Sequence, residues 1–359
     1  MTLPNSASRR SVLHALAAGG IGSLAGCLGG FETQSAWRDP PLVADRPDAV
    51  YLPAITEGMK LYGRTTAGPY GVVLSYSYPH RFWTVAGTDL TKTPVGSEDS
   101  IHLMVSLWDA ETGTVLPVDA GVEIEITQGD RLVSQEVAYP MLSQQMGFHY
   151  GSNYALDGEG DYTATVRVGG VNLRRTGSFA GRFETVETVD FDFTFDTDDL
   201  YDVGITRLGD RQGSRDAVEP MDMGFPVGRA PAVDDLPGRH LGSGTSGDAV
   251  FDGFVVDDGS RFGVDRSYLY VTARTPYNGV VVPMMGLRAT VTRDGATVFD
   301  GTLDRTLDPT VGYHYGAAVD SLDPDDTVEL TVEVPPQVAR HDGYETAFFE
   351  MPPTTLSRS

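Results

Sequence analysis

The chain has 359 residues and a formal net charge of −24, from 50 acidic and 26 basic side chains. A nucleic-acid-binding protein needs a basic surface, so this balance argues against nucleic acid as a partner. Lys60 and Lys92 are its lysines, and the acidic residues are spread along the whole chain. Such a surface is typical of proteins from extreme halophiles, where strong salt screens the self-repulsion.

Residues 1–27 predict a signal for export. Ser8-Arg9-Arg10-Ser11-Val12-Leu13 is a twin-arginine pattern, which directs folded proteins through the Tat pathway. The apolar run that follows, from Val12 to Leu28, is too short and too rich in glycine to span a membrane well. Leu24-Ala25-Gly26-Cys27 resembles a lipobox, and Cys27 is the single cysteine. We expect lipid on Cys27 to anchor the exported protein to the outer face of the cytoplasmic membrane.

The next segment, residues 28–50, is rich in Gly, Pro and Asp and lacks periodicity, so it predicts a flexible tether. Strand patterns follow it. Strict alternation of apolar and polar residues in Val122–Thr127, Tyr162–Val168 and Val189–Phe195 predicts half-buried strands. No window with helical period stands out in the mature chain. We therefore predict an all-β protein built from sandwiches.

The second half of the chain repeats the order of the first at an offset of about 165 residues. Tyr268–Thr272 matches His102–Ser106, and Gly312-Tyr313-His314-Tyr315-Gly316 matches Gly147-Phe148-His149-Tyr150-Gly151. A constant offset indicates an internal duplication. The prediction is two tandem immunoglobulin-like β-sandwich modules, residues 51–204 and 205–352, followed by a tail, residues 353–359.

The repeated aromatic-His-Tyr-Gly turn is the strongest candidate for a functional site. In the first module Met141 and Met146 lie just before His149. In the strand that contains His102, alternation places Met104 on the same face. Thioether sulfur and neutral imidazole are ligands that suit copper, above all Cu(I). The alternative is that the histidines are hydrogen-bonded structural residues and that the methionines fill the core.

These residues also resemble a known family. Ile101-His102-Leu103, Pro140-Met141, His149-Tyr150-Gly151-Ser152-Asn153 and Gly158-Glu159-Gly160-Asp161-Tyr162 are similar to motifs of the periplasmic high-affinity iron-transport proteins of bacteria. Members of that family are immunoglobulin-like dimers that bind copper and support iron uptake. The resemblance covers roughly residues 55–195.

The resemblance implies copper ligands at His102, Met141 and His149. Two positions depart from the family pattern. Met104 stands where the family has an acidic residue, and the family's late histidine pair aligns near Arg174-Arg175. The first module is therefore expected to hold a Met/His/His site, with Met104 as a candidate fourth ligand.

In the second module His314 keeps its place, but Tyr268 replaces the strand histidine. The segment up to His341 resembles the part of the family that carries the late histidine. Two arrangements are open. Either the second module only packs against the first and copies the family's dimer within one chain, or His314 and His341 form a second, weaker metal site.

Enzyme signatures are missing from the sequence: it has no Gly-x-Ser-x-Gly motif, no thiol nucleophile and no phosphate-binding loop. We therefore expect a protein that is not an enzyme. The first hypothesis is a lipid-anchored copper-binding protein that assists iron or copper uptake, with an iron permease as a candidate partner. The second is a tandem immunoglobulin-like surface protein for interaction or scaffolding, in which the histidines are structural.

Overall fold

The computed structural model describes residues 40–358, so the export signal, Cys27 and residues 28–39 of the predicted tether lie outside the described part. Strands make up half of the structure, and the one α-helix in the described part, α2 (Thr197–Tyr201), has five residues. The all-β, sandwich-type prediction is confirmed. The immunoglobulin-like connectivity and the division into two modules stay predictions.

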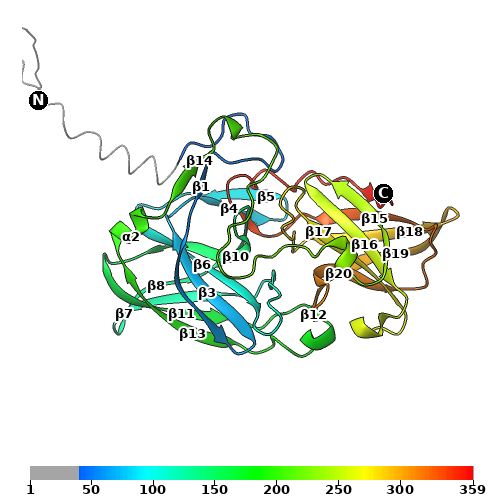
Figure 1. Cartoon of the computed structure of the whole chain (residues 1–359), viewed down its shortest axis with the longest axis horizontal. Coiled ribbons are helices and arrows are strands. Elements are labelled where there is room, and N and C mark those ends of the chain that lie inside the picture. The colour runs from blue at the N-terminus through cyan, green and yellow to red at the C-terminus, as the bar shows by residue number, and fades with distance from the viewer. Residues whose placement is uncertain (1–39, 359) are drawn as a thin grey trace, which may run out of the picture. The chain divides into compact units, whose positions relative to one another are not determined.

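An eight-stranded sheet forms the first half of the fold (Figure 1). Its strands, in spatial order, are β2 (Lys60–Ala67), β3 (Tyr70–Ser77), β6 (Asp99–Asp109), β10 (Gly147–Ala155), β9 (Tyr139–Ser143), β22 (Ala339–Arg340), β4 (Phe82–Ala86) and β5 (Asp89–Thr93).

A four-stranded sheet completes this half. Its strands, in spatial order, are β13 (Glu187–Phe195), β11 (Gly160–Val168), β7 (Glu123–Gln128) and β8 (Arg131–Val137).

Alternation along these strands decides what each face buries. Leu103 and Val105 of β6 join Ile124 of β7 and Val166 of β11 in one apolar core, because every second side chain points to the same face. The residues between them point to the opposite face of the eight-stranded sheet. His102 and Met104 are on that opposite face.

A nine-stranded sheet forms the second half, in which β19 (Ala296–Asp308) pairs with both β20 (Gly312–Val319) and β18 (Gly286–Arg293). The short strand β12 (Arg174–Arg175) adds to it beside β19. Its other strands, in spatial order, are β15 (Arg239–Ser246), β16 (Ala249–Val256), β17 (Ser267–Arg274), β20 (Gly312–Val319), β19 (Ala296–Asp308), β18 (Gly286–Arg293), β21 (Thr327–Val334) and β23 (Thr354–Thr355).

A two-stranded sheet of β1 (Ile55–Glu57) and β14 (Ile205–Arg207) links the start of the first half to its end. Within the described residues no helix is both long and apolar enough to cross a membrane.

Residues 40–50 differ from the tether that the sequence predicts. Ala49 and Val50 are fully buried, and Arg46 forms an ion pair with Glu345. The hydroxyl of Thr346 donates to the carbonyl of Pro47 at 2.9 Å. A segment without periodicity is ordered here because distant residues satisfy its polar groups, which local sequence cannot reveal.

The C-terminal segment crosses between the two halves. The sequence assigns Ala339 and Arg340 to the second module, yet as β22 they pair in parallel with Met141 and Leu142 of β9. Arg340 also pairs with Trp83 of β4. The predicted tail is likewise part of the fold, since β23 pairs with β21.

The first half makes the reciprocal exchange. Arg174 of β12 pairs in parallel with Thr306 of β19, just as Ala339 pairs with Met141. The repeat offset of about 165 residues maps one pair of contacts onto the other. Each half therefore contributes its late short strand to the sheet of the other half, an arrangement that the predicted pseudo-dimer would produce.

Candidate metal centre

The candidate site lies on the face of the eight-stranded sheet that points away from the sandwich core. In the antiparallel register His102 of β6 lies opposite Asn153 of β10, and Met141 of β9 lies opposite His149. Alternation places all of these residues on one face because their neighbours Leu103, Leu142, Phe148 and Tyr150 fill the core. His102, Met141 and His149 are each fully buried.

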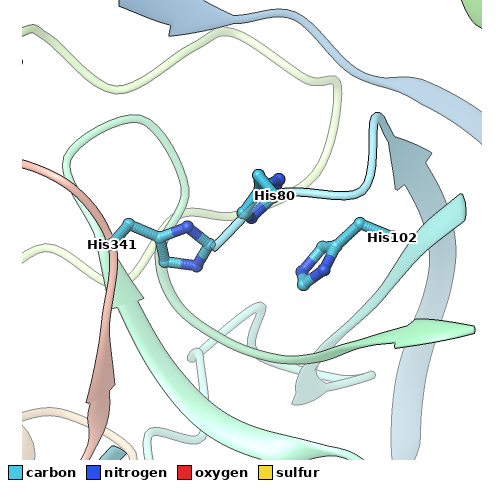
Figure 2. Close-up of side chains that lie close together, drawn as sticks. All are labelled: His80, His102 and His341. Atoms are coloured by element: carbon cyan, nitrogen blue, oxygen red, sulfur yellow. The ribbon is translucent and has the colours of Figure 1, made fainter. Parts of the chain in front are cut away.

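Two further histidines reach this face from outside the β6–β10–β9 group. His80 lies in the loop before β4, and His341 directly follows β22. The ligand atoms of His80, His102 and His341 all lie within 4.8 Å of one another, and Figure 2 shows their rings gathered around one space. The ring centroid of His149 is 5.2 Å from that of His341. Four imidazoles therefore form one cluster, which we call the histidine centre.

In three of the four rings a hydrogen bond engages Nδ1 and leaves Nε2 free. Nδ1 of His102 lies 2.7 Å from Oδ1 of Asn153, Nδ1 of His149 lies 3.1 Å from the carbonyl of Gly147, and Nδ1 of His80 lies 2.9 Å from the carbonyl of Tyr78. A ring that donates through Nδ1 presents the lone pair of Nε2. Nε2 of His80, His102, His149 and His341 is buried and has no hydrogen-bond partner among the residues that the structure describes.

Unpaired buried nitrogens are costly, because each has given up its bonds to water at a cost of roughly 1–3 kcal/mol. Four in one cluster call for an explanation. A bound metal ion would supply it, because histidine ligands commonly bind through one nitrogen while the other donates to a carbonyl or side-chain oxygen that fixes the ring. The donor set therefore fits a metal on the chemistry of the side chains themselves.

Burial also sets the charge of the centre. It lowers the pKa of His149 to about 4, and burial together with the neighbouring His80 holds the pKa of His102 and of His341 well below the usual range. These three rings are neutral at pH 7, which is the protonation state that a metal ligand needs. His80 differs: burial lowers its pKa, but the carboxylate of Glu57, 3.2 Å from Nδ1, outweighs that and raises it overall.

Gly151 makes room for two of the candidate ligands. A Cβ atom at this position would lie 2.7 Å from Nε2 of His102 and 3.1 Å from Sδ of Met141. The two donor atoms therefore occupy the space directly above the Gly151 backbone. The His-Tyr-Gly run lies within strand β10 and not in the turn that the sequence predicts, and this close approach explains why it ends in glycine although its φ does not require one.

We expect Gly151→Ala to weaken metal binding by pushing His102 and Met141 apart, and to cost roughly 1–3 kcal/mol of stability through overpacking. Gly316→Ala is the matched control, because its Cβ would instead meet the hydroxyl of Tyr268 in the second half. Copper titration and urea unfolding of both variants test this. Equal copper affinity in the two variants would contradict the placement of the ligands.

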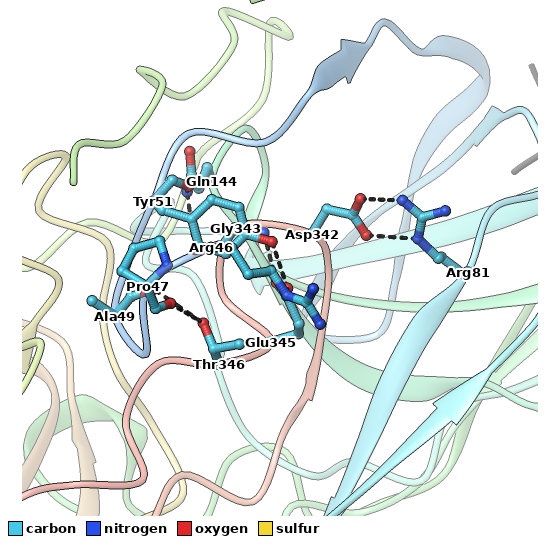
Figure 3. Close-up of polar contacts among 10 residues, drawn as sticks. All are labelled: Arg46, Pro47, Ala49, Tyr51, Arg81, Gln144, Asp342, Gly343, Glu345 and Thr346. Atoms are coloured by element: carbon cyan, nitrogen blue, oxygen red, sulfur yellow. Dashed lines mark hydrogen bonds and ion pairs between the residues drawn. The ribbon is translucent and has the colours of Figure 1, made fainter. Parts of the chain in front are cut away.

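An ion pair joins the residues that follow His80 and His341 in the chain (Figure 3). Arg81, next to His80, contacts Asp342, next to His341, through Nε at 3.2 Å and Nη2 at 2.6 Å. The Arg81 side chain is only 4% exposed. A two-point contact of this kind fixes the geometry of both chains as well as their distance.

The carboxylate of Glu345 anchors the same C-terminal segment. It is fully buried, accepts hydrogen bonds from the hydroxyl of Tyr51 and from the Gly343 amide at 2.8 Å, and forms an ion pair with Arg46 Nε at 2.7 Å. Gln144, which follows β9, adds a hydrogen bond of 2.8 Å to the carbonyl of Tyr51. This polar network fixes the segment that carries His341 to the first half, although that segment lies near the other end of the sequence.

The second half has no equivalent cluster in the described residues. His314 repeats the contact of His149, with Nδ1 3.1 Å from the carbonyl of Gly312, but its Nε2 lies 3.2 Å from the hydroxyl of Tyr268. That hydroxyl in turn lies 3.5 Å from Thr306. Rings of Phe262, Tyr268 and Tyr270 surround the imidazole. His314 is therefore satisfied by hydrogen bonds, as a structural histidine is.

His314 predicts a dependence of stability on pH. Burial lowers its pKa to about 4, helped by Arg174 and Arg261 and opposed by Asp308 and by the bond to Gly312. Below pH 6.5 the unfolded chain binds a proton that the folded chain refuses, so the free energy of unfolding falls as the pH drops from about 6.5 to about 4.

With a pKa of about 6.5 in the unfolded chain and about 4 in the folded chain, the free energy of unfolding falls by about 3 kcal/mol over this pH range. We expect His314→Gln to remove most of this share of the acid sensitivity, measured as the fall in unfolding free energy of metal-free protein between pH 7 and pH 4. If wild type and variant lose stability equally, His314 is not a buried neutral imidazole.

The structure thus brings together some of the residues that the sequence singles out and separates others. His102, Met141 and His149 gather on one face. Met104 lies on that face as well, where it packs with Met146 and Trp108. The arrangement that joins His314 to His341 in a second site is wrong, because His341 lies in the histidine centre of the first half.

His80 was missed by the sequence reasoning. It belongs to no repeated motif and follows a strand in the run Ser77-Tyr78-Pro79-His80. The position of the late histidine is also different from the family pattern: Arg174-Arg175 lies in the second half, where Arg174 covers the ring of Tyr268. The exchange of β12 and β22 is the reason.

The fold and this cluster together define an all-β protein with a buried histidine centre. A family model described as "Domain of unknown function (DUF7350)" matches residues 234–357, which contain β15 to β23 and His314 and His341. Comparison with curated proteins finds no match. Comparison with solved structures finds none either.

Proposed function

We propose that this protein binds copper, chiefly as Cu(I), at the histidine centre, and that it serves iron or copper uptake outside the cell. The observation that carries the proposal is the set of four buried Nε2 atoms without hydrogen-bond partners among the described residues. The thioether of Met141 beside His102 makes the donor set softer. Calcium and magnesium prefer oxygen ligands, so they fit this set poorly.

The resemblance to the periplasmic iron-transport proteins supports the same proposal. The residues that match the family's copper ligands, His102, Met141 and His149, lie together. His341 joins them from the second half, and in this proposal it replaces the late histidine that the first half lacks. The exchange of β12 and β22 supports a single chain that copies the family's dimer. We propose that a lipid on Cys27 holds the protein at the outer face of the membrane, within reach of a permease.

The competing function is a surface protein for interaction or scaffolding with structural histidines. His314 favours it in one respect, because this matching histidine of strand β20 is hydrogen-bonded to Tyr268, as a structural residue is. The histidine centre differs from His314 in the bonding of Nε2. That difference is why we place the metal proposal first.

Metal titration tests the proposal. Full-length protein is titrated with Cu(I) buffered by a chromogenic chelator, and in parallel with Cu(II) and Fe(II). A ligand that binds only the folded state at a hundred times its Kd stabilises it by about 2.7 kcal/mol, so Cu(I) should raise the melting temperature. An unchanged melting temperature, with all copper left on the chelator, would reject the metal function and favour the structural one.

A further inference from the structure

Four methionines line a pocket next to the histidine centre. Met59, Met104, Met146 and Met221 contribute to its wall, and His80 and His341 form the part of the wall that it shares with the centre. Other polar residues of the wall include Glu57, Ser143 and Asp342.

The methionines come from separate parts of the chain. Met104 belongs to β6, Met146 to the turn before β10, and Met59 and Met221 to irregular segments. Met104 and Met146 are buried, with 3% and 6% of their surface exposed, while Met59 and Met221 are only partly buried. Two of the four methionines are therefore partly open to solvent and two are buried, and all four line the same pocket as His80 and His341.

Core filling alone does not account for this arrangement. Methionine often fills irregular gaps in a core, and Met104 and Met146 do pack against Trp108. Here, however, the four side chains border a cavity of about 110 Å³ instead of filling it. Pockets for small organic ligands measure roughly 300–1,000 Å³, so this one suits a single ion better.

The polar groups of the pocket point to a cation. The carboxylates of Glu57 and Asp342 lie in the wall together with the guanidinium of Arg81. Arg81 pairs with Asp342, and Glu57 lies beside His80. With the protein's net charge of −24, the surroundings attract positive ions. Thioethers select soft metals such as Cu(I) over hard cations.

We propose that this methionine pocket is a second soft-metal site, which binds Cu(I) on its way into the histidine centre. The ion binds first to the thioethers and then passes to His80 and His341, which face both sites. The transfer exchanges ligands only: the ion keeps its charge and no electron moves. The role as an access site rests on the proposed copper function, but the binding of a soft ion by the thioethers does not.

Silver(I), a redox-silent substitute for Cu(I), tests the pocket in full-length protein. Wild type should bind two equivalents. The variant Met59→Leu/Met221→Leu keeps the shape and apolar character of the pocket but removes two sulfurs. We expect it to bind the second equivalent about 10–100-fold more weakly, the range for losing supporting groups at a metal site, and the first equivalent unchanged.

Met351→Leu is the matched control, since Met351 is a partly buried methionine packed against the main core. It should bind both equivalents as wild type does. His102→Ala/His149→Ala should lose the tighter equivalent and keep the one at the methionines. X-ray absorption of that variant with one equivalent should show sulfur neighbours around silver.

The outcomes separate the two proposals. A single equivalent in wild type, or a second equivalent that survives Met59→Leu/Met221→Leu, overturns the methionine pocket and leaves the histidine centre intact. Equal weakening by Met351→Leu also overturns it. Two equivalents that are both insensitive to His102→Ala/His149→Ala would instead reject the histidine centre.

Discussion

His149→Ala is expected to lower the Cu(I) affinity of the protein at least about a hundredfold, since even groups that only support a metal ligand contribute 10–100-fold. Nε2 of His149 is buried beside His341 and has no hydrogen-bond partner among the described residues. His102→Ala should have an effect of the same size. Chelator competition with Cu(I) at pH 7 gives the affinities directly.

His314→Ala supplies the matched control for His149→Ala. The two histidines occupy matching positions in strands β10 and β20, both are fully buried, and both have Nδ1 3.1 Å from a glycine carbonyl. They differ at Nε2, which in His314 meets Tyr268. His314→Ala should therefore cost about 2–3 kcal/mol of stability through a cavity and a lost hydrogen bond, with Cu(I) affinity unchanged.

The pair of variants distinguishes the two functions. If His149→Ala and His314→Ala reduce stability to a similar degree and neither changes copper binding, both histidines are structural. The scaffold function would then be preferred. If only His149→Ala releases copper, the difference at Nε2 has a functional meaning.

Glu345→Ala is expected to lower the free energy of unfolding by about 3 kcal/mol, because removing one partner of a buried ion pair leaves the other groups unpaired. The hydroxyl of Tyr51 and the amide of Gly343 would lose their acceptor, and Arg46, 30% exposed, would lose its carboxylate. Burial raises the pKa of Glu345, which reflects the low polarity around it.

The same variant should also weaken copper binding by roughly tenfold, since supporting groups around a metal ligand have effects of this order. Glu345 holds the segment that carries His341 against the first half. Urea unfolding and copper titration measure the two effects. Glu333→Ala is the control: Glu333 is 43% exposed and lies 3.8 Å from Arg288, so its loss should change stability by less than about 0.5 kcal/mol. A Glu345→Ala protein as stable as this control would contradict the anchoring role.

Part of the candidate site was predictable from sequence because it depends on local alternation. His102 shares a face with Met104 since side chains in a strand alternate. Met141 and His149 meet because β9 and β10 form one hairpin, whose short turn fixes the register. The two-residue period of a strand is therefore enough to predict that these residues lie on one face of the sheet.

Other parts depend on packing between distant segments. Residues 40–50 looked like a tether by composition, but Glu345 and Thr346 order them. His80 carries no signal in its own neighbourhood. Residues 40–50 meet partners near the other end of the chain, and His80 meets His102 and His341 only through the folded sheet, so no periodicity encodes either contact.

By itself, the sequence determined that this protein is built of β-strands and that His102, Met141 and His149 face the same way, because strand alternation is a property of consecutive residues. Only the tertiary structure decided that His80 and His341 complete the centre and that His314 stands apart from it. The physical reason is the exchange of β12 and β22 between the two halves. The free backbone groups along the edge of a strand can pair with any segment that reaches them, so the tertiary structure decides which segment does.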